Sequence, residues 1–328
     1  SLDDVIKKID ELRMNSGLRP EIFRNIMNDL ALYGYDLFGE PVNPEPSGVV
    51  AEKFTMPPFS LLDARSGSWQ ERKRAWLRLG LQSEIGRGEN LIEYSKTTSI
   101  KGGKDTSVFD PVLTELIYKW FTPEGGQVVD PFAGGSVRGI IALILNRNYW
   151  GSELRKEQVS ENIKQAEFLC PNDKPVWIAG DSMETLDDAP DADFIFSCPP
   201  YGDLEKYSDD PRDLSNMEFH TFIPAYKRII FRSCKKLKQN RFACFVVGDF
   251  RDKKGFYRNF VSETIKAFKE SGLELYNEAI LATAIGSASM RVSRIFPSGR
   301  KLAKTHQNIL VFVKGDWKKA SNKINATG

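Results

Sequence analysis

From residue 108 onward, short apolar segments alternate with amphipathic ones, and this alternation limits the fold more than any other feature. Runs typical of strands, such as 193–197 and 242–247, are separated by segments of helical spacing, such as 156–168 and 219–237. Strands that alternate with helices form a parallel sheet with helices on both faces. The sequence therefore predicts a doubly wound α/β sheet, which binds ligands at the carboxyl ends of its strands.

The two ends of this pattern differ from its middle. No helix is predicted between the last two strands, near 273–281 and 308–313, so we expect them to form an antiparallel hairpin at one edge of the sheet. At the other end of the chain, apolar residues recur at helical spacing over about the first 40 residues, before a turn-rich linker at 39–48. We therefore expect an N-terminal, mainly helical region ahead of the sheet.

Composition excludes several classes of protein. The chain of 328 residues has four cysteines without a Cys-x-x-Cys pair and only two histidines, so we expect neither disulfides nor a cysteine/histidine metal site. No apolar run approaches the roughly 20 residues of a membrane span, and the N-terminal residues lack a signal-peptide core. We expect a cytoplasmic protein. Because its net charge is only +2, any affinity for nucleic acid must come from local patches.

The first motif is a glycine turn between a predicted strand and a helix. The strand ends at Asp130, and the turn continues through Phe132, Gly134 and Gly135 to Ser136. A glycine pair lets the backbone approach a ligand closely where the helix begins. The motif is not G-x-G-x-x-G, which disfavours a dinucleotide site. Taken alone, it is also compatible with a purely structural turn.

Two acids follow the ends of the next two predicted strands. Glu153 stands where α/β nucleotide-binding proteins place a carboxylate on ribose hydroxyls, about 20 residues beyond the loop. Asp181 ends the following strand. Either acid alone is more often a helix cap. Because both occur in register after the glycine turn, they favour a ligand site.

The second motif follows the apolar strand at 193–197. Ser197 leads into Cys198, Pro199, Pro200 and Tyr201, and two prolines make a rigid turn with few hydrogen-bond donors. Such a turn holds an aromatic ring over a cleft. Cys198 before a proline is also compatible with a buried structural cysteine, but the paired glycine turn disfavours that as the full explanation.

Together, the two motifs resemble those of S-adenosylmethionine-dependent DNA amino-methyltransferases, D-P-F-x-G-x-G and (D/N/S)-P-P-(Y/F/W). The resemblance covers roughly 106–316 and implies a seven-stranded methyltransferase sheet. It also implies that the chain transfers a methyl group from S-adenosylmethionine to cytosine N4 or adenine N6 in DNA, leaving S-adenosylhomocysteine. The domains would then be an N-terminal region at 1–105, in which a DNA contact is conceivable, a methyltransferase domain at 106–316 and a tail at 317–328.

The resemblance also implies which residues bind the cofactor. In the family, the loop acid lies near the cofactor's ammonium group, and the acid at the position of Asp181 hydrogen-bonds the adenine amine. Ser136 stands where the family has its second glycine, and its small hydroxyl should fit. The residues carried over to this chain are Ser107, Phe109, Asp130, Phe132, Gly134, Gly135, Ser136, Glu153, Asp181 and Ser182.

The second motif departs from the family at its first position. There the family uses a side-chain acceptor and the carbonyl of the first proline to hold the target amine, which correspond to Cys198 and Pro199 here, while Tyr201 would stack on an extruded base. A thiol is only a weak acceptor. Three explanations stay open: the Cys198 carbonyl replaces its side chain, Ser197 reaches in through a bulge, or the chemistry differs, with Cys198 attacking pyrimidine C6.

A basic segment near the end of the sheet is the candidate for DNA contact. Between 290 and 306 there is no acid, and the segment has the composition of a loop. Cations in such a loop can clamp phosphates, although a solvated basic loop is the simpler alternative. The cations are Arg291, Arg294, Arg300, Lys301 and Lys304. DNA is the expected partner, with a restriction or phage modification system as a conceivable setting.

Two other functions remain open. A methyltransferase of the same fold could act on RNA or on a protein side-chain amide. Alternatively, because Cys198 replaces the usual acceptor, the chain could be a DNA-binding module whose transfer site has decayed.

Overall fold

The computed structural model describes residues 54–81, 109–202, 208–286 and 288–326. The chain divides into two compact units, 1–57 and 58–328, and the second is described here. The helices expected in the first 40 residues and the expected boundary between 105 and 106 lie outside the described residues.

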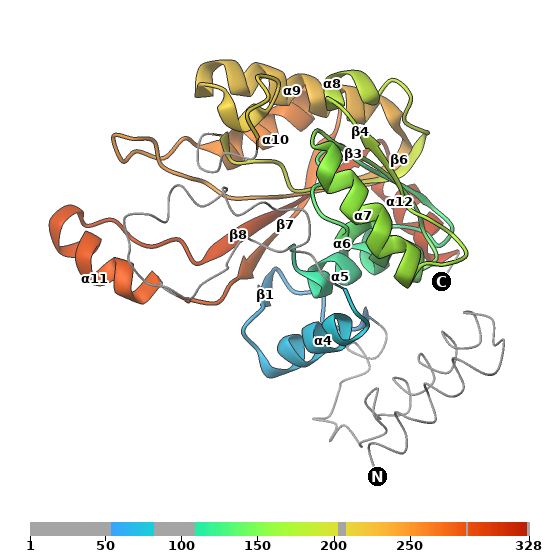
Figure 1. The fold of residues 1–328 in the computed structure, drawn as a ribbon, viewed down its shortest axis with the longest axis horizontal. Helices are drawn as coiled ribbons and strands as arrows, with labels where there is room; N and C mark the ends of the chain where they lie inside the picture. The colour runs from blue at the N-terminus through green and yellow to red at the C-terminus, as the bar shows by residue number, and fades with distance from the viewer. Residues whose placement is uncertain (1–53, 82–108, 203–207, 287, 327–328) are drawn as a thin grey trace, which may run out of the picture. The chain divides into compact units, whose positions relative to one another are not determined.

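One mixed sheet forms the centre of this unit (Figure 1), with the strand order β1-β7-β8-β6-β5-β2-β3-β4. Neighbouring strands are parallel except that β8 is antiparallel to both β6 and β7. The predicted doubly wound, mostly parallel α/β sheet and its antiparallel hairpin are therefore confirmed. The strands are β1 (Leu61–Asp63), β2 (Gln127–Asp130), β3 (Asn148–Glu153), β4 (Val176–Ala179), β5 (Ala192–Ser197), β6 (Leu237–Val247), β7 (Glu274–Ala282) and β8 (His306–Lys314).

Strand β1 is an eighth strand beyond the seven that the sequence predicts. It pairs in parallel with β7, Leu61 lying opposite Ile280, so the β7–β8 hairpin is not at the edge of the sheet. Backbone hydrogen bonds from Ile280 to Ser60 and from Ala64 to Ala282 extend the pairing. Three residues are too few for a strand pattern to be read from a sequence, because side-chain alternation needs a longer run.

Helices cover both faces of the sheet. The helices α8 (Ser182–Thr185), α9 (Phe219–Lys236) and α10 (Phe260–Glu270) lie above it in Figure 1. On the other face lie α5 (Pro111–Phe121), α6 (Val137–Ile144) and α12 (Trp317–Asn325), with α7 (Lys156–Leu169) beside β3 and β4 and α4 (Gly67–Arg78) against α5. One hydrophobic core cluster includes the buried rings of Phe222, Tyr226, Phe245, Phe260, Phe268 and Phe312.

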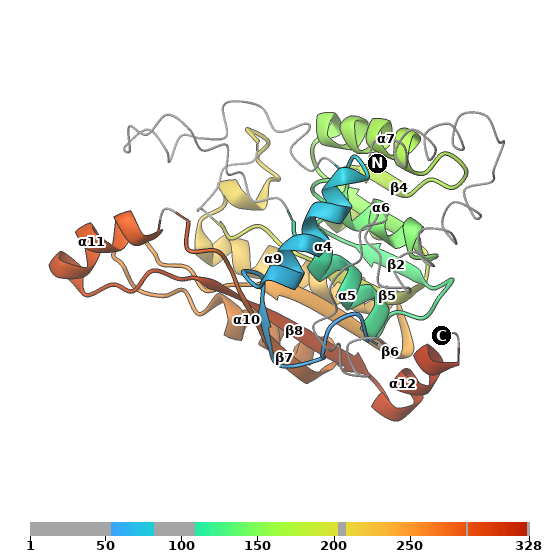
Figure 2. The same ribbon diagram turned by 90° about the horizontal axis from the view of Figure 1, so that it is seen from below.

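The segment between β7 and β8 contains a helix, α11 (Ala288–Gly299), where we expected a loop. This expectation is wrong because Val292, Ile295 and Phe296 recur at helical spacing, a signal obscured by the surrounding serines and the glycine. We call β7, α11 and β8, with their connections, the arm; α11 projects away from the helices that cover the sheet (Figure 2).

The predicted tail at 317–328 also contains a helix. Asp316 caps α12 by accepting a hydrogen bond from the backbone of Lys318 at 2.8 Å, and Ala320 is buried. No helix in the part of the chain that the structure describes has the length and apolar character needed to cross a membrane.

Candidate functional site

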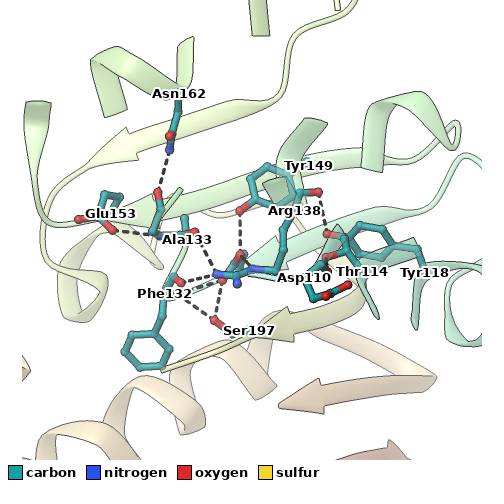
Figure 3. Close-up of polar contacts among 12 residues, drawn as sticks. Asp110, Thr114, Tyr118, Phe132, Ala133, Arg138, Tyr149, Glu153, Asn162 and Ser197 are labelled. Carbon is teal, nitrogen blue, oxygen red and sulfur yellow. Dashed lines mark hydrogen bonds and ion pairs between the residues drawn. The ribbon is translucent and has the colours of Figure 1, made fainter. Parts of the chain in front are cut away.

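A buried network holds the glycine turn that follows β2 (Figure 3). The Asp130 carboxylate is fully buried. One oxygen, Oδ2, is 2.6 Å from Arg138 Nε and accepts from the Tyr149 hydroxyl at 2.8 Å. The other, Oδ1, accepts from the Ser197 hydroxyl at 2.5 Å and from the Phe132 amide at 3.1 Å. Asp130 therefore holds the turn from inside the protein.

Arg138 fixes the carbonyls of the same turn. Its guanidinium donates to the carbonyls of Phe132 at 2.7 Å and Ala133 at 2.9 Å and lies 4.4 Å from the centre of the Phe109 ring. Burial by itself would lower the pKa of this guanidinium, but the adjacent Asp130 carboxylate outweighs it and raises the pKa. The turn is therefore held by Arg138 through both of these carbonyls and through Asp130.

Gly134 joins the turn to the end of β3. Its φ of +54° lies in the left-handed region, which a side chain would strain, and a Cβ there would meet nothing within 4 Å. The Gly134 amide donates to Glu153 Oε2 at 3.0 Å, and its carbonyl accepts from Asn162 Nδ2 at 2.8 Å. Glu153 also accepts from the Arg155 amide at 2.9 Å. Burial raises the pKa of Glu153.

The two sequence motifs line one cavity of about 390 Å³ at the carboxyl ends of the strands. Asp130, Ser136 and Ser197 are not among its lining residues, and Ser107 lies outside the described residues. Ser136 is instead buried and donates to Gln165. The lining residues predicted from the sequence are Phe109, Phe132, Gly134, Gly135, Glu153, Asp181, Ser182, Cys198, Pro199, Pro200 and Tyr201.

At one end of the cavity, Asp181 and Ser182 begin α8. Asp181 caps this helix by accepting from the Met183 amide at 2.8 Å. The Ser182 hydroxyl donates to the carbonyl of Pro131, in the glycine turn, at 2.5 Å. The start of α8 is thus tied to the turn that follows β2 through Ser182.

Ser197 is directed away from the cavity. It is fully buried, and its hydroxyl donates to Asp130 and accepts from the Phe132 amide at 3.1 Å. Strands β5 and β6 stay in register up to the pair of Ser197 and Phe245, and the irregularity lies earlier, between Ala192 and Phe194. In the structure, therefore, Ser197 does not reach the site through a bulge.

Tyr201 is held in place by three neighbours. Its ring packs edge-on against Phe250 and Phe260, with centroid separations of 6.3 Å and 6.1 Å. Its hydroxyl accepts from Gln307 Nε2 at 2.9 Å. The ring orientation is therefore set by two aromatic contacts and one hydrogen bond.

Several lining residues escape the sequence analysis. Arg212 and Asp213 come from the segment before α9, Gln307 comes from β8, and Gln70 and Lys73 come from α4. None lies in a recognisable motif. Their positions depend on long-range contacts.

The position of α4 depends on a buried carboxylate in α5, Glu115. Glu115 pairs with Arg72 and, at 2.9 Å, with Lys119, and it accepts from Trp76 Nε1 at 2.9 Å. Burial by itself would raise the pKa of Glu115, but the two cations outweigh it and lower the pKa to about 2. In the sequence, the available signal was the single acid within the apolar stretch 111–118, because a buried acid needs a partner.

The predicted DNA-contact cations lie on the arm. Arg294, Arg300 and Lys301 are exposed, and Arg291's side chain lies outside what the structure describes. Lys304 is half-buried, with Nζ 3.2 Å from His306 Nε2. Burial lowers the pKa of both Lys304 and His306. Among the described residues, no group of three His, Cys, Asp or Glu side chains could hold a metal ion.

Comparisons with known proteins identify no family. No family model matches the chain, and no curated protein matches it. Among solved structures, it is similar to TrmN from Thermus thermophilus, with 13% identity over 62% of this chain and 49% of that chain and a TM-score of 0.43. It is also similar to precorrin-6y C5,15-methyltransferase from Geobacter metallireducens, with 14% identity over 65% of this chain and 92% of that chain and a TM-score of 0.41. A third similar structure is magnesium protoporphyrin IX methyltransferase from Synechocystis with bound SAM, with 12% identity over 59% of this chain and 71% of that chain and a TM-score of 0.38.

Proposed function

We propose that this chain is an S-adenosylmethionine-dependent methyltransferase that methylates an exocyclic amino nitrogen, cytosine N4 or adenine N6, in DNA. One observation carries the proposal: the Gly134–Gly135 turn and the Pro199–Tyr201 turn line the same cavity. A methyl donor held by the first turn and an acceptor held by the second would then meet in one space.

The groups that line the cavity fit S-adenosylmethionine. Its volume of about 390 Å³ lies in the range of small-molecule sites. Gly134 and Gly135 leave room for the amino-acid part, Glu153 suits the ribose hydroxyls, and Asp181 suits the adenine amine. When bound, the cofactor supplies an electrophilic methyl group on a sulfonium. Asp130, whose expected place was beside the cofactor's ammonium, acts in this proposal by holding the turn.

The second turn suits an amine that is a poor nucleophile. The lone pair of a cytosine or adenine amine is delocalised into the ring, and acceptors on its two hydrogens help to localise it. The carbonyl of Pro199 is one such acceptor. For the other we favour the Cys198 carbonyl, because a thiol accepts weakly and the Ser197 hydroxyl is already bound to Asp130. No base is needed beforehand, because the amine can lose its proton after transfer.

Tyr201 and the arm support a nucleic-acid substrate. A base must leave the helix before its amine can enter a cavity, and an aromatic ring stacks on the extruded base. The Tyr201 ring is held at the cavity wall by Phe250, Phe260 and Gln307. Exposed Arg294, Arg300 and Lys301 on the arm suit phosphates on either side of that base.

The test is methyl transfer to defined substrates. The protein is incubated with S-adenosylmethionine labelled in its methyl group and with double-stranded DNA, single-stranded DNA, RNA or a protein mixture, and the products are identified by mass spectrometry. We expect N4-methylcytosine or N6-methyladenine in DNA. Label found only in RNA or only in protein would refute the DNA assignment, and cofactor binding without transfer to any of these would favour the decayed module.

Substitutions at the departing position separate an adapted site from a decayed one. Cys198→Ser and Cys198→Asp each restore an acceptor typical of the family. If Cys198 is adapted, both variants lose activity in the same assay. A gain in either variant would instead show that the wild-type site has lost part of its function.

A further inference from the structure

A short hairpin between β6 and α10 projects from the same edge of the sheet as the cavity. It spans 250–258, and its strands are joined by backbone hydrogen bonds from Arg258 to Phe250 at 2.9 Å and from Asp252 to Phe256 at 2.8 Å. Arg251 and Tyr257 lie opposite each other as an isolated bridge. The chain reverses at 252–255, where the Gly255 amide donates to the Asp252 carbonyl at 2.9 Å.

The tip of this hairpin is braced by side chains. Asp252 Oδ1 accepts from the Phe256 amide at 2.9 Å, and Arg251 donates to the Gly255 carbonyl at 2.9 Å. The Arg251 guanidinium also covers the Tyr257 ring at 3.9 Å from its centre. Despite this bracing, the Phe256 side chain is 70% exposed. The hairpin therefore presents a large apolar ring to solvent on a braced support.

The base of the hairpin packs on the second motif. Phe250 contacts the Tyr201 ring, and a Cβ on Gly202 would lie 3.3 Å from the Phe250 ring. On the opposite side, the Arg258 guanidinium lies 4.6 Å from the centre of the Phe219 ring. The base of the hairpin therefore contacts Tyr201, a residue that lines the cavity, and Phe256 is the exposed ring nearest the hairpin's tip.

Cations surround the tip. Lys253 and Lys254 are exposed in the turn, and Lys301 of the arm lies so near that a Cβ on Gly255 would collide with its Nζ. The hairpin and the arm therefore approach each other at this point, and Figure 1 shows both projecting beyond the same end of the sheet. An apolar ring among cations matches a nucleic acid, in which stacked bases lie between phosphates.

We propose that Phe256 enters the base stack of a duplex and occupies the space left when the target base moves into the cavity. The inference rests on the proposed function, because only an enzyme that extrudes a base creates that space. Apolar side chains inserted between base steps are a known way to hold a duplex open. Phe256 is then a positioning residue: it stabilises the extruded state, and the residues of the cavity act on the base.

The test separates extrusion from binding and from chemistry. A duplex with 2-aminopurine beside the methylated position reports extrusion by a rise in fluorescence. We expect Phe256→Ala to lose most of this rise and to lower kcat/KM on the paired duplex about tenfold, the effect of one lost base–aromatic stack. On a duplex with a mismatch at the target, its kcat/KM should return to within about twofold of wild type, because unpairing then costs less.

Matched variants serve as controls. Phe256→Trp should keep the rise and the rate, because the larger ring can still stack. Phe59→Ala removes a ring of similar exposure, 68%, from the segment before β1 and should behave as wild type. Thermal unfolding and cofactor binding of all three variants should match wild type.

Three results would overturn the inference. The Phe256→Ala variant could show the fluorescence rise and the rate of wild type, or it could be impaired equally on paired and mismatched duplexes. In the third result, its oligomeric mass in solution differs from that of wild type. The failure of the proposed function has a different signature, because wild type would then methylate no DNA. If RNA alone is methylated, the same comparison on an RNA duplex tests Phe256.

Discussion

Glu115 offers a quantitative test of how α4 is attached to the sheet domain. The residue is buried in α5, and its carboxylate binds Arg72, Lys119 and Trp76. Glu115→Gln keeps the size of the side chain and removes its charge. We expect the variant to fold less stably at neutral pH, because the attraction to Arg72 and Lys119 is lost.

The size of the effect follows from the pKa of Glu115. This carboxyl has a pKa of about 2 in the folded protein, against an ordinary value of 4.5. As pH falls, the Glu115 carboxyl therefore takes up a proton in the unfolded chain before it does so in the folded protein. The stabilisation is complete above pH 4.5 and is lost as pH falls through 2. This difference in pKa stabilises the folded protein by about 3 kcal/mol at pH 7 and by about 1 kcal/mol at pH 3.

Urea unfolding of the wild type and of Glu115→Gln at several pH values measures this term. Trp69 and Trp76, both buried in α4, report the transition by fluorescence. We expect the gap in unfolding free energy to narrow by about 2 kcal/mol between pH 7 and pH 3. Subtracting the unfolding free energy of the variant from that of the wild type at each pH removes the contribution of every other carboxyl that titrates in that range.

Two results would refute this reasoning. A gap that stays constant with pH would mean that the Glu115 carboxyl is not held ionised by its partners. A variant as stable as wild type at pH 7 would mean that Arg72 and Lys119 gain as much from water as from Glu115.

Two further substitutions test the site and its support. Asp181→Ala should weaken S-adenosylmethionine binding about tenfold by calorimetry, the contribution of one hydrogen bond to a charged group; unchanged affinity would remove Asp181 from the proposed cofactor site. Gly139→Ala should lower the unfolding free energy by roughly 1–3 kcal/mol, because its Cβ would collide with the Trp177 ring; an unchanged urea midpoint would show that this ring can move aside.

Part of the candidate site could be predicted because both motifs follow strands of one parallel arrangement. The glycine turn follows β2 and the Pro-Pro-Tyr turn follows β5, and the carboxyl ends of parallel strands share one edge of a sheet. The two strands are also direct neighbours. The common cavity therefore follows from motif order and strand direction, without knowledge of side-chain contacts.

The directions of individual side chains could not be predicted in the same way. Asp130 and Ser197 end adjacent strands and turn toward each other, and so the two motif residues that were expected at the ligand bind one another inside the protein. The contact depends on the pairing of β2 with β5 and on Arg138, which enters from the following helix. No pattern within either motif specifies it.

The sequence by itself determined the order of seven strands, the antiparallel pairing of the last two and the two turns at the carboxyl ends of the parallel strands, because hydrophobic spacing and turn residues act over a few neighbouring positions. Only the tertiary structure decided that β1 joins β7, that α4 borders the cavity, that Gln307 holds Tyr201, and that Phe256 is exposed on a hairpin that packs on Tyr201. Each of these depends on contacts between residues distant in the chain, whose free energies arise only when the sheet has formed.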